Sequence, residues 1–419
     1  MNIKKIKITN FKSFKDLEIE LGRFNVLIGA NASGKSNFIH IFEFLRDIAT
    51  SGLNNAISMQ GGIEYLRNMN IGASENLFVS ISIFPDQGFI WLGSQRIKEN
   101  LIAIETNEII YEFALKFNKK GAGFKVAKDK LIQKSKFIKL TRHKKKLKKN
   151  EMLGDGQILI SRSNGKVKID LDIPEKVPLK KEDIVPPFLR EEKLPNHTLL
   201  LETLYFLPWE RIFSSDISIY DFDPKLPKKA TPITGKAELE EDGSNLSIIL
   251  KNIIENKEKK RKLFNLVKDL LPFVKNLDVE KFADKSLLFK LQEMYFENQY
   301  LPASLISDGT INITALIIAL YFEKKSLVII EEPERNIHPY LISKVVNMMK
   351  DASQQKQIIV TTHNPEIVKH AGLEDILLVY RDKNGFSKIS RPGDKEEVKT
   401  FLKNDIGIEE LYVQNLLEI

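Results

Sequence analysis

A glycine-rich stretch near the start of the chain has the spacing of a phosphate-binding loop. Gly29 is followed by four residues and then by Gly34, Lys35 and Ser36. Glycines let backbone N–H groups curl around phosphate oxygens, the lysine adds a positive charge, and the serine hydroxyl can bind Mg²⁺. The stretch therefore predicts ATP and Mg²⁺ as ligands, with Ser36 on the metal. The predicted nucleotide contacts are Asn31, Ala32, Ser33, Gly34, Lys35, Ser36 and Asn37.

An acidic pair lies much farther along the chain, at the end of an apolar run. Leu327–Ile330 is followed by Glu331, Glu332 and Pro333. A carboxylate at the end of a buried strand can reach the Mg²⁺ shell, which suits Glu331. The adjacent Glu332 is suited to orient or deprotonate the attacking water. An isolated acidic pair is more often an exposed strand end, but together with the phosphate loop it predicts ATP hydrolysis.

A serine and a glycine precede a long apolar helical stretch. Ser307 and Gly309 belong to the run Ser-Asp-Gly-Thr, and such residues before a helix N-terminus can form a second phosphate cradle. Alone, the pattern is typical of an ordinary capped helix start. Its position, 24 residues before Glu331, favours the phosphate-binding interpretation.

A histidine follows another apolar strand. His363 lies in Thr-Thr-His-Asn, 31 residues after Glu332. Although a lone histidine is usually structural, one at the end of a parallel strand beside the acidic strand can contact a γ-phosphate. We therefore assign a catalytic role to His363 as well as to Glu332.

Strands and helices alternate around these residues. Arg23–Ile28 is a predicted buried strand before the phosphate loop, and Ser36–Ile48 is a predicted amphipathic helix after it, which argues against a functionless glycine turn. Leu327–Ile330 and Gln357–Thr361 are predicted strands, with the helical stretch Leu341–Met349 between them. This order indicates a parallel sheet.

The remaining patterns indicate antiparallel strands and a short helical arm. A helix begins after Gly243-Ser-Asn245, with the serine or asparagine as its cap, and a second covers Lys257–Leu271; neither sustains the heptads of a coiled coil. Further strands are predicted at Ile3–Asn10, Leu17–Leu21, Leu77–Phe84, Gly88–Leu92, Ile109–Phe117 and Lys166–Ile173.

The overall composition excludes several classes of protein. The 419-residue chain has no cysteine, so a disulfide scaffold and a thiolate zinc site are excluded. The basic N-terminus lacks a following apolar region and is not a secretory signal. Ile311–Phe322, the best candidate for a membrane span, is far shorter than the roughly 20 residues required. We expect a cytoplasmic protein without a membrane partner.

Positive charge is concentrated in one insertion. The net charge is +8, yet residues 116–149 contain fifteen Lys or Arg and one acid, Asp129. Two interpretations stay open: residues 116–150 form a solvated loop, or they bind the phosphate backbone of DNA without sequence preference. Phe117, Phe124 and Phe137 are the only Phe, Tyr or Trp residues of the insertion, so stacking on bases is not indicated.

In their order along the chain, the four patterns resemble those of the ABC-type ATPases, within the SMC-like and RecF-like branch. The resemblance covers about residues 1–115 and 285–395. It implies an α/β fold, an ABC-type P-loop NTPase with a split head, an antiparallel β subdomain and a short helical arm insertion. It further implies a homodimer that closes around ATP, in which Ser307 and Gly309 complete the partner subunit's site.

The resemblance also implies roles for single residues, with some departures. Lys12 stands where relatives carry a nucleotide-contacting basic residue, most often arginine. Glu331 replaces the usual metal-binding aspartate, Glu332 is the catalytic base and His363 the switch histidine. Glu334–His338 corresponds to the D-loop. The Q-loop glutamine is not placed; the candidates are Gln60, Gln87 and Gln95.

The domain division follows from the split head. Residues 1–215 are expected to form the N-terminal half with the β-rich subdomain and the basic insertion. Residues 216–280 would form the helical arm, 281–395 the C-terminal half of the head, and 396–419 a C-terminal tail.

A finer resemblance is to the predicted ATPases labelled AAA-21 or AAA-15, which are similar to the ATPase part of the OLD (overcoming lysogenization defect) nucleases. The blocks that carry it are Leu239–Leu246, Ser307–Thr310, Glu331–Glu334 with His338 and Pro339, and Thr361–His363. Only 56 residues follow His363, so we expect no TOPRIM nuclease domain. The resemblance implies an ATPase switch that regulates a separate nuclease or toxin in phage defence.

A second hypothesis is a DNA-binding clamp in repair, similar to RecF, in which ATP gates DNA. Duplex-stimulated ATPase activity would favour the clamp, whereas a neighbouring gene for a TOPRIM-like protein would favour defence. A transporter ATPase is disfavoured, because almost 300 residues separate the motifs and the signature is not Leu-Ser-Gly-Gly-Gln.

Overall fold

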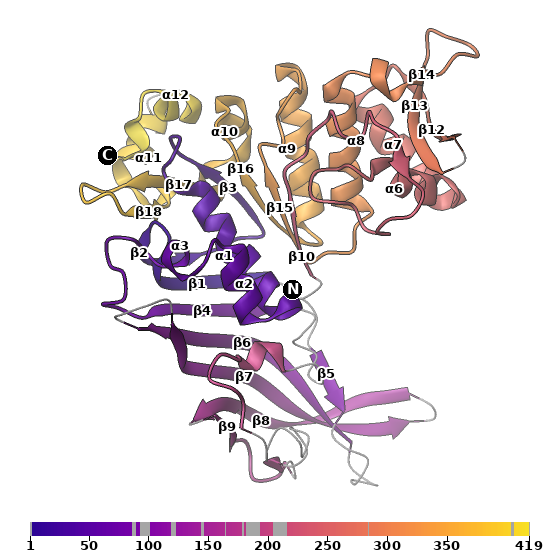
Figure 1. The fold of residues 1–419 in the computed structure, drawn as a ribbon. Coiled ribbons are helices and arrows are strands. Elements are labelled where there is room, and N and C mark those ends of the chain that lie inside the picture. The colour runs from indigo at the N-terminus through magenta and orange to yellow at the C-terminus, as the bar shows by residue number, and fades with distance from the viewer. Residues whose placement is uncertain are drawn as a thin grey trace. The chain divides into compact units, whose positions relative to one another are not determined.

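The computed structural model forms two compact units (Figure 1). The first, called the β-rich unit below, comprises Met1–Leu21, Ser36–Ser214 and Arg381–Lys388. The second, the parallel-sheet unit, comprises Gly22–Lys35, Ser215–Tyr380 and Ile389–Ile419. The structure describes residues 2–85, 89–92, 101–118, 123–143, 146–163, 165–177, 180–181, 193–203, 216–283, 285–403 and 406–418.

The β-rich unit is built on an eight-stranded sheet in the order β2-β1-β4-β6-β7-β8-β9, with β5 paired to β6. The registered pairs are antiparallel. In β4 every second residue from Leu77 to Ile83 is buried, as expected of a strand with one face on a core. The strands are β1 (Asn2–Phe11), β2 (Phe14–Glu20), β4 (Leu77–Phe84), β5 (Phe89–Leu92), β6 (Leu101–Phe117), β7 (Phe124–His143), β8 (Lys146–Ser163) and β9 (Lys166–Asp172).

Helix α1 (Lys35–Ser51) continues directly from the phosphate loop, and its apolar face is buried in the β-rich unit. Phe44 of this helix lies between two aromatic rings of the sheet, with centroids 6.0 Å from Phe11 in β1 and 6.4 Å from Phe113 in β6. Two shorter helices, α2 (Leu53–Met59) and α3 (Ile63–Leu66), follow, and η2 (Leu200–Glu202) is a single 3₁₀ turn. Helix α1 is thereby anchored through Phe44 to a packed sheet.

The basic insertion lies in this sheet. Apart from Asn118 and Gly123, its described residues belong to β6, β7 and β8, so the solvated-loop interpretation is wrong for those strand residues. Strand β6 also begins at Leu101, eight residues before the predicted start at Ile109. The sequence pattern did not reveal strand β7, because its lysines alternate with apolar residues. The many lysines gave this strand the appearance of a solvated, charged loop.

The parallel-sheet unit contains a six-stranded sheet in the order β10-β15-β16-β3-β17-β18. The registered pairs from β10 to β17 are parallel. All residues of β3 and β16 and the first four of β15 are buried, as is typical of a sheet covered on both faces. The strands are β3 (Phe24–Ile28), β10 (Ile217–Tyr220), β15 (Leu327–Glu331), β16 (Gln357–Thr361), β17 (Ile376–Arg381) and β18 (Ser387–Ser390).

Helices and a small second sheet complete this unit. The small sheet has the order β11-β13-β12, with β14 paired to β13. Its strands are β11 (Thr231–Pro232), β12 (Val274–Phe282), β13 (Ser286–Glu293) and β14 (Leu301–Pro302). The helices are α6 (Leu246–Ile254), α7 (Lys257–Leu270), α8 (Asp308–Tyr321), α9 (Pro339–Ser353), α10 (Pro365–Ala371), α11 (Glu396–Lys403) and α12 (Ile408–Val413), with the 3₁₀ turns η3 (Ala303–Leu305), η4 (Leu373–Asp375), η5 (Pro392–Asp394) and η6 (Leu416–Glu418).

Helix α8 is the central helix of the core. Every residue from Thr310 to Leu320 is buried, which explains why this stretch is apolar on all sides. The predicted helices of the arm, α6 and α7, contribute Leu246, Leu250 and Leu263 to the same apolar core. Among the residues that the structure describes, no helix has the length and apolarity required to cross a membrane.

Candidate functional site

The phosphate loop begins at the carboxyl end of β3, where glycine is required. Gly29 has φ 148°, and a Cβ atom there would lie 2.1 Å from the carbonyl oxygen of Val379 in β17. Gly34 has φ 119° and Ala32 has φ 61°, so the backbone repeatedly enters the left-handed region. A chain that turns this way exposes successive N–H groups on one side, which fits the oxygens of a triphosphate.

Lys35 supplies the cation of this loop. Its side chain is buried, and its Nζ donates hydrogen bonds to the carbonyl oxygens of Gly29 at 2.8 Å and Ala30 at 3.1 Å. Burial lowers the pKa of Lys35 to about 8, an effect opposed by the charges of Glu332 and Glu331. The ammonium is therefore held across the loop by weak carbonyl partners that a phosphate could replace.

The acidic pair lies at the same edge of the sheet. Glu331 is the last residue of β15 and is registered with Thr361 of β16. Glu332 has φ 44°, and its N–H donates to the carbonyl oxygen of Thr361 at 2.9 Å. Its carboxylate lies between a guanidinium and an imidazole: Oε2 is 3.1 Å from Nη2 of Arg335, and Oε1 is 3.9 Å from Nε2 of His363. The structure thus brings Glu332 and His363 together as predicted.

Neighbouring side chains fix the loop that carries His363. The hydroxyl of Thr362 donates to Oε1 of Glu334 at 2.5 Å and accepts from the N–H of Asn364 at 2.9 Å. Asn364 in turn caps α10 through the N–H of Glu366. Burial and the charge of Lys35 lower the pKa of His363, although Glu332 opposes them. The imidazole therefore holds a proton less readily than an exposed histidine does.

Ser307 acts as the N-cap of α8, and Gly309 allows a close backbone approach. The Ser307 hydroxyl accepts a hydrogen bond from the N–H of Thr310 at 3.2 Å. A Cβ atom on Gly309 would lie 2.4 Å from the carbonyl oxygen of Asn336. The start of α8 is thus packed tightly on the loop that follows the acidic pair. Helix capping was one of the two interpretations of Ser307. A phosphate-binding role toward a partner subunit stays a prediction.

Lys12 and Asn37 line one cavity of about 410 Å³ in the β-rich unit. Asn37 donates from Nδ2 to the hydroxyl of Ser13 at 2.8 Å. Burial lowers the pKa of Lys12, opposed by the charge of Glu43. Burial and, to a smaller extent, the charge of Lys12 lower the pKa of His40 to about 4, so this histidine adds no positive charge beside Lys12. The two predicted nucleotide contacts therefore line the same cavity.

Three residues of the site were not predicted. Arg335 and Asp221 form an ion pair beside Glu332, with Nη1 and Oδ1 2.8 Å apart. Tyr412 of α12 has its hydroxyl hydrogen-bonded to the backbone of Gly29. Arg335 directly follows the predicted Glu-Glu-Pro-Glu block, a signal that could have been used. Of the Q-loop candidates, Gln60 is buried and forms the C-cap that follows α2, whereas Gln87 and Gln95 lie outside the described residues.

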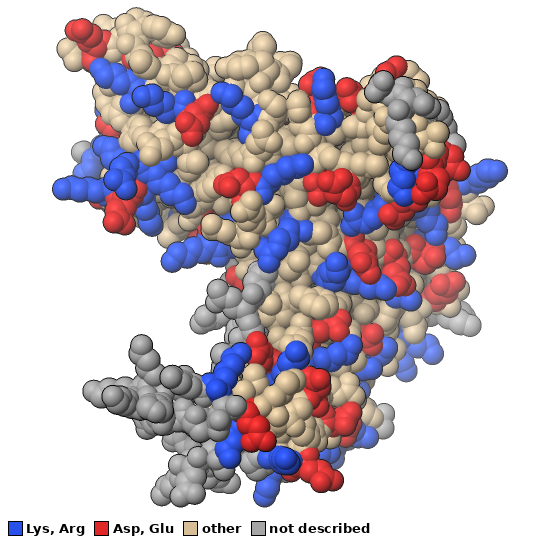
Figure 2. Space-filling model, turned by 180° about the vertical axis from the view of Figure 1, so that it is seen from behind, with Lys and Arg blue, Asp and Glu red and all other residues tan. Residues whose placement is uncertain are grey.

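The positive charge of the insertion is partly neutralised within its own sheet. Acidic side chains of β6 face lysines of β7 and β8, and acidic and basic residues lie interspersed on the face seen in Figure 2. The three closest pairs, each at 2.8 Å, are Lys128–Glu112, Lys134–Glu108 and Lys149–Glu105. A count of charges along the insertion therefore overstates the field that a DNA backbone would meet.

Comparison with known protein families gives a match over most of the chain. Residues 24–369 match the family described as "AAA domain, putative AbiEii toxin, Type IV TA system". A stretch of 48 residues is 48% identical to structural maintenance of chromosomes protein 3 of Caenorhabditis elegans, covering 11% of this chain and 4% of that protein. A stretch of 93 residues is 26% identical to the uncharacterized protein MJECL43 of Methanocaldococcus jannaschii, covering 22% of this chain and 24% of that protein. The chain thus spans a quarter or less of the length of these relatives.

A solved structure with a TM-score above 0.5 shares the fold. The SMC head bound to the C-winged helix domain of ScpA has a TM-score of 0.51 at 14% identity, over 93% of this chain and 98% of that chain. The SMC head domain from Thermotoga maritima has a TM-score of 0.43 at 14% identity, over 93% and 99% of the two chains. The first likeness shows the predicted fold: an α/β head of the ABC type with an added antiparallel sheet and helices.

Proposed function

The chain belongs to the family of AAA domains described as a putative AbiEii toxin of a type IV toxin–antitoxin system, and from that premise we propose that it is an ATP-driven molecular switch. It is a P-loop ATPase of the SMC-like type. In the proposed cycle it binds ATP with Mg²⁺, closes as a homodimer, and reopens after hydrolysis. The observation that carries the proposal is the meeting of Glu332 with His363 at 3.9 Å, beside the buried cation of Lys35.

Each site residue has one role in this proposal. The loop residues Asn31 to Asn37 hold the phosphates, and Lys35 exchanges its two carbonyl partners for phosphate oxygens. Ser36 and Glu331 would hold Mg²⁺, since a hydroxyl and a carboxylate are the hard oxygen ligands that it prefers. The metal would neutralise charge on the phosphates. Lys12 and Asn37 would also contact the nucleotide, as the family resemblance implies.

Glu332 and His363 carry the hydrolytic step. Glu332 orients the attacking water and accepts its proton, which requires a carboxylate with a free lone pair on Oε1. The lowered pKa of His363 favours the neutral imidazole, which can donate a hydrogen bond to a γ-phosphate oxygen without placing a second full charge beside Lys35. Ser307 and Gly309 complete the site of the partner copy, supported by their place at the N-terminus of α8.

For the biological output we favour control of a separate toxin or nuclease in phage defence. This is supported by the family description, which contains the words toxin and type IV toxin–antitoxin. The second candidate is a DNA clamp in repair, supported by the 48-residue similarity to a chromosome-maintenance protein. The ion pairs between β6 and the basic strands weaken the support for DNA binding through residues 116–150. Strong stimulation of ATPase activity by duplex DNA would favour the clamp, and a co-purifying toxin would favour defence.

The substitution Glu332→Gln tests the central assignment. It preserves size and removes the base, so ATP should still bind while hydrolysis slows by about 10²–10⁴-fold. Because hydrolysis reopens the closed state, the variant should accumulate as an ATP-bound dimer. Phosphate release and light scattering with and without ATP measure both effects. The control is Glu397→Gln, an exposed glutamate in α11. Hydrolysis at the wild-type rate in Glu332→Gln would show that the catalytic assignment is wrong.

A further inference from the structure

The carboxylate of Glu332 is held by Arg335. The two residues lie in one turn, where the N–H of Arg335 donates to the carbonyl oxygen of Glu332 at 3.0 Å. Nη2 of Arg335 lies 3.1 Å from Oε2 of Glu332, and this contact leaves Oε1 directed toward His363. Because Glu332 has a left-handed backbone, its side chain leaves the strand in an unusual direction and needs a fixed partner to keep one orientation.

Arg335 is itself held from its other side. Nη1 contacts Oδ1 of Asp221 at 2.8 Å and the carbonyl oxygen of Phe222 at 3.3 Å. The carbonyl oxygen of Arg335 accepts a hydrogen bond from Nδ2 of Asn312 in α8 at 2.6 Å. Each end of the planar guanidinium is therefore occupied, one by Asp221 and the other by Glu332. A guanidinium can bridge two acids in this way, and an ammonium cannot do so with the same geometry.

Asp221 is placed beside Glu332 by the sheet and fixed by a neighbouring segment. It directly follows β10, whose last residue Tyr220 is registered with Ile330 of β15, so both acids leave the same sheet edge. The N–H of Asp221 donates to the carbonyl oxygen of Glu241 at 3.0 Å. Two residues on, the N–H of Asp223 donates to the carbonyl oxygen of Asp242 at 3.1 Å. The backbone of residues 241–242 thus holds the segment that carries Asp221.

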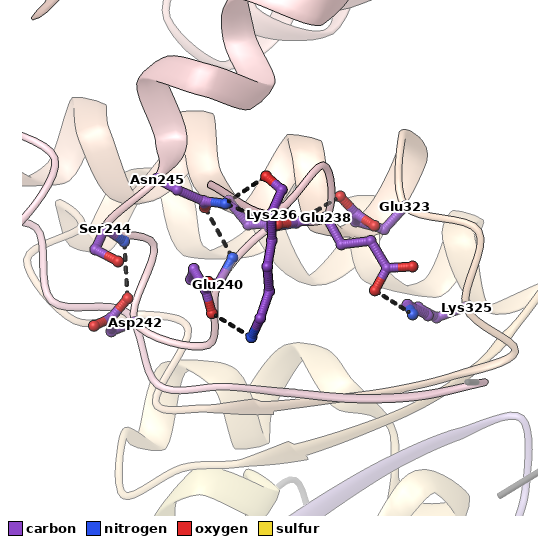
Figure 3. A network of polar contacts seen from close by, with 9 residues as sticks. Lys236, Glu238, Glu240, Asp242, Ser244, Asn245, Glu323 and Lys325 are labelled. Atoms are coloured by element: carbon purple, nitrogen blue, oxygen red, sulfur yellow. Dashed lines mark hydrogen bonds and ion pairs between the residues drawn. The ribbon is translucent and has the colours of Figure 1, made fainter. Parts of the chain in front are cut away.

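Residues 238–245, called the acidic segment below, are ordered by the polar network in Figure 3. Asn245 donates from Nδ2 to the carbonyl oxygen of Glu238 at 2.8 Å and accepts from the N–H of Glu240 at 2.9 Å. Glu238 also pairs with Lys325 at 2.8 Å, and Glu323 accepts from the N–H of Leu239 at 3.0 Å. Asn245 stands at the N-cap of α6 but makes no capping bond, since its side chain is used in this network.

We propose that Arg335 is a positioning residue for Glu332, and that the acidic segment sets its position through Asp221. The proposal rests on the proposed function and assigns a role to the block Leu239–Leu246, which the nucleotide chemistry does not use. The side chains of Arg335 and Glu332 are each 39% exposed, and that of Asp221 is 57% exposed. Their ion pairs therefore add at most about 1 kcal/mol to the free energy of unfolding. Its effect is on geometry, where a displacement of about 1 Å can cost roughly 10²-fold in rate.

The first test compares Arg335→Met with Arg335→Lys in the full chain. Arg335→Met should lower kcat for ATP hydrolysis by about 10–100-fold, with KM for ATP changed by less than about twofold and the melting temperature nearly unchanged. Arg335→Lys should have a kcat between those of Arg335→Met and the wild type. Lysine retains the positive charge but cannot bridge Asp221 and Glu332. The matched control is Arg391→Met, a half-buried arginine of the same unit whose Nη1 donates to the carbonyl oxygen of Glu374. A wild-type or raised kcat in Arg335→Met, or a raised KM with unchanged kcat, would overturn the role.

Double variants test the chain of contacts. Asp221→Asn should lower kcat less than Arg335→Met, and combining the two should cost no more than Arg335→Met alone, since both act on one interaction. In a Glu332→Gln background, Arg335→Met should have no further effect. Multiplicative losses in either double variant would contradict the proposal. A failure of the proposed function is distinguishable, because then Glu332→Gln itself would hydrolyse ATP normally.

Discussion

At the residue scale, Lys35 supplies the positive charge proposed to bind phosphate, but its side chain is buried, where a charge is unfavourable. Its ammonium is buried on two carbonyl oxygens, and burial lowers the pKa of Lys35 to about 8. A bound phosphate adds negative charge within contact distance and raises the pKa again. The free protein therefore loses this cation at a pH where the nucleotide-bound protein retains it.

The first prediction follows from that difference. Below pH 8 Lys35 is already charged, whereas above pH 8 binding of ATP must take up a proton, so affinity should fall by up to tenfold per pH unit. Calorimetry between pH 7 and 9, with a non-hydrolysable ATP analogue in buffers of different ionisation enthalpy, measures the proton uptake. Since the charge of Glu332 raises the pKa of Lys35, Glu332→Gln should move the onset to lower pH. Affinity that does not change over this range would contradict the prediction.

Single residues were predictable where chemistry and strand ends coincide. The phosphate loop, Glu332 and His363 all follow buried apolar strands, and parallel strands deliver their carboxyl ends to one edge. Arg335 and Asp221 were missed because their pairing joins positions more than a hundred residues apart, through a strand, β10, that carries no motif. Knowledge of the sheet order was needed before an acid after β10 could be placed beside Glu332.

At the element scale, strand β7 holds an acid in the interior of the β-rich unit. Asp129 accepts a hydrogen bond from the hydroxyl of Tyr111 in β6 at 2.9 Å and from the N–H of Leu200 in η2 at 2.7 Å. It is almost fully buried, and burial raises the pKa of Asp129 to about 7 despite these bonds. The one acid of the basic insertion thus joins three elements of the fold.

The second prediction concerns the pH dependence of stability. A carboxyl group with a raised pKa in the folded state stabilises most below its unfolded pKa near 4, and this contribution is lost as pH rises toward 7. The free energy of unfolding should therefore fall by a few kcal/mol from this group between pH 4 and pH 8. Asp129→Asn should flatten the slope, as denaturant titrations at several pH values would reveal. The exposed Asp155→Asn is the control, and an equal slope in Asp129→Asn and the wild-type would contradict the assignment.

Strand β7 also shows how much structure can be predicted from the alternation of lysines with other residues. One face of β7 carries Lys128, Lys130 and Lys134. Their even spacing in the sequence predicts this, because side chains alternate between the two faces of a strand. Their acidic partners lie in β6 and depend on the register between the two strands, including the irregularity near Thr106 and Glu108. The register between β6 and β7 is fixed by burial of the opposite face of the sheet. It therefore could not be predicted from the sequence of one strand alone.

At the scale of the whole molecule, the proposed site is complete only when two copies meet. Ser307 caps α8 in its own chain, and α8 contacts the loop after the acidic pair through Gly309 and Asn312. A partner that docks on Ser307 would therefore act on a helix that is connected to Arg335 and Glu332. The split arrangement of motifs predicted the head fold correctly, whereas dimerisation stays a proposal.

Mixing two defective variants tests the composite site. Ser307→Arg places a bulky cation where the partner's phosphates must dock, and its own phosphate loop and Glu332 remain intact. In a heterodimer with Glu332→Gln, one site combines the intact Glu332 of the first chain with the intact Ser307 of the second. The other site carries both defects. A mixture should therefore hydrolyse ATP faster than either variant alone, and phosphate release across mixing ratios measures the gain.

A matched variant separates docking from helix capping in that experiment. Ser307→Ala also removes the hydrogen bond to Thr310, at a cost of about 1 kcal/mol to the start of α8, but adds no bulk. It should dimerise with ATP, as seen by light scattering, where Ser307→Arg does not. If Ser307→Arg is fully active as a monomer, or if the mixture shows only the summed activity of its components, each chain hydrolyses ATP by itself and the composite site is wrong.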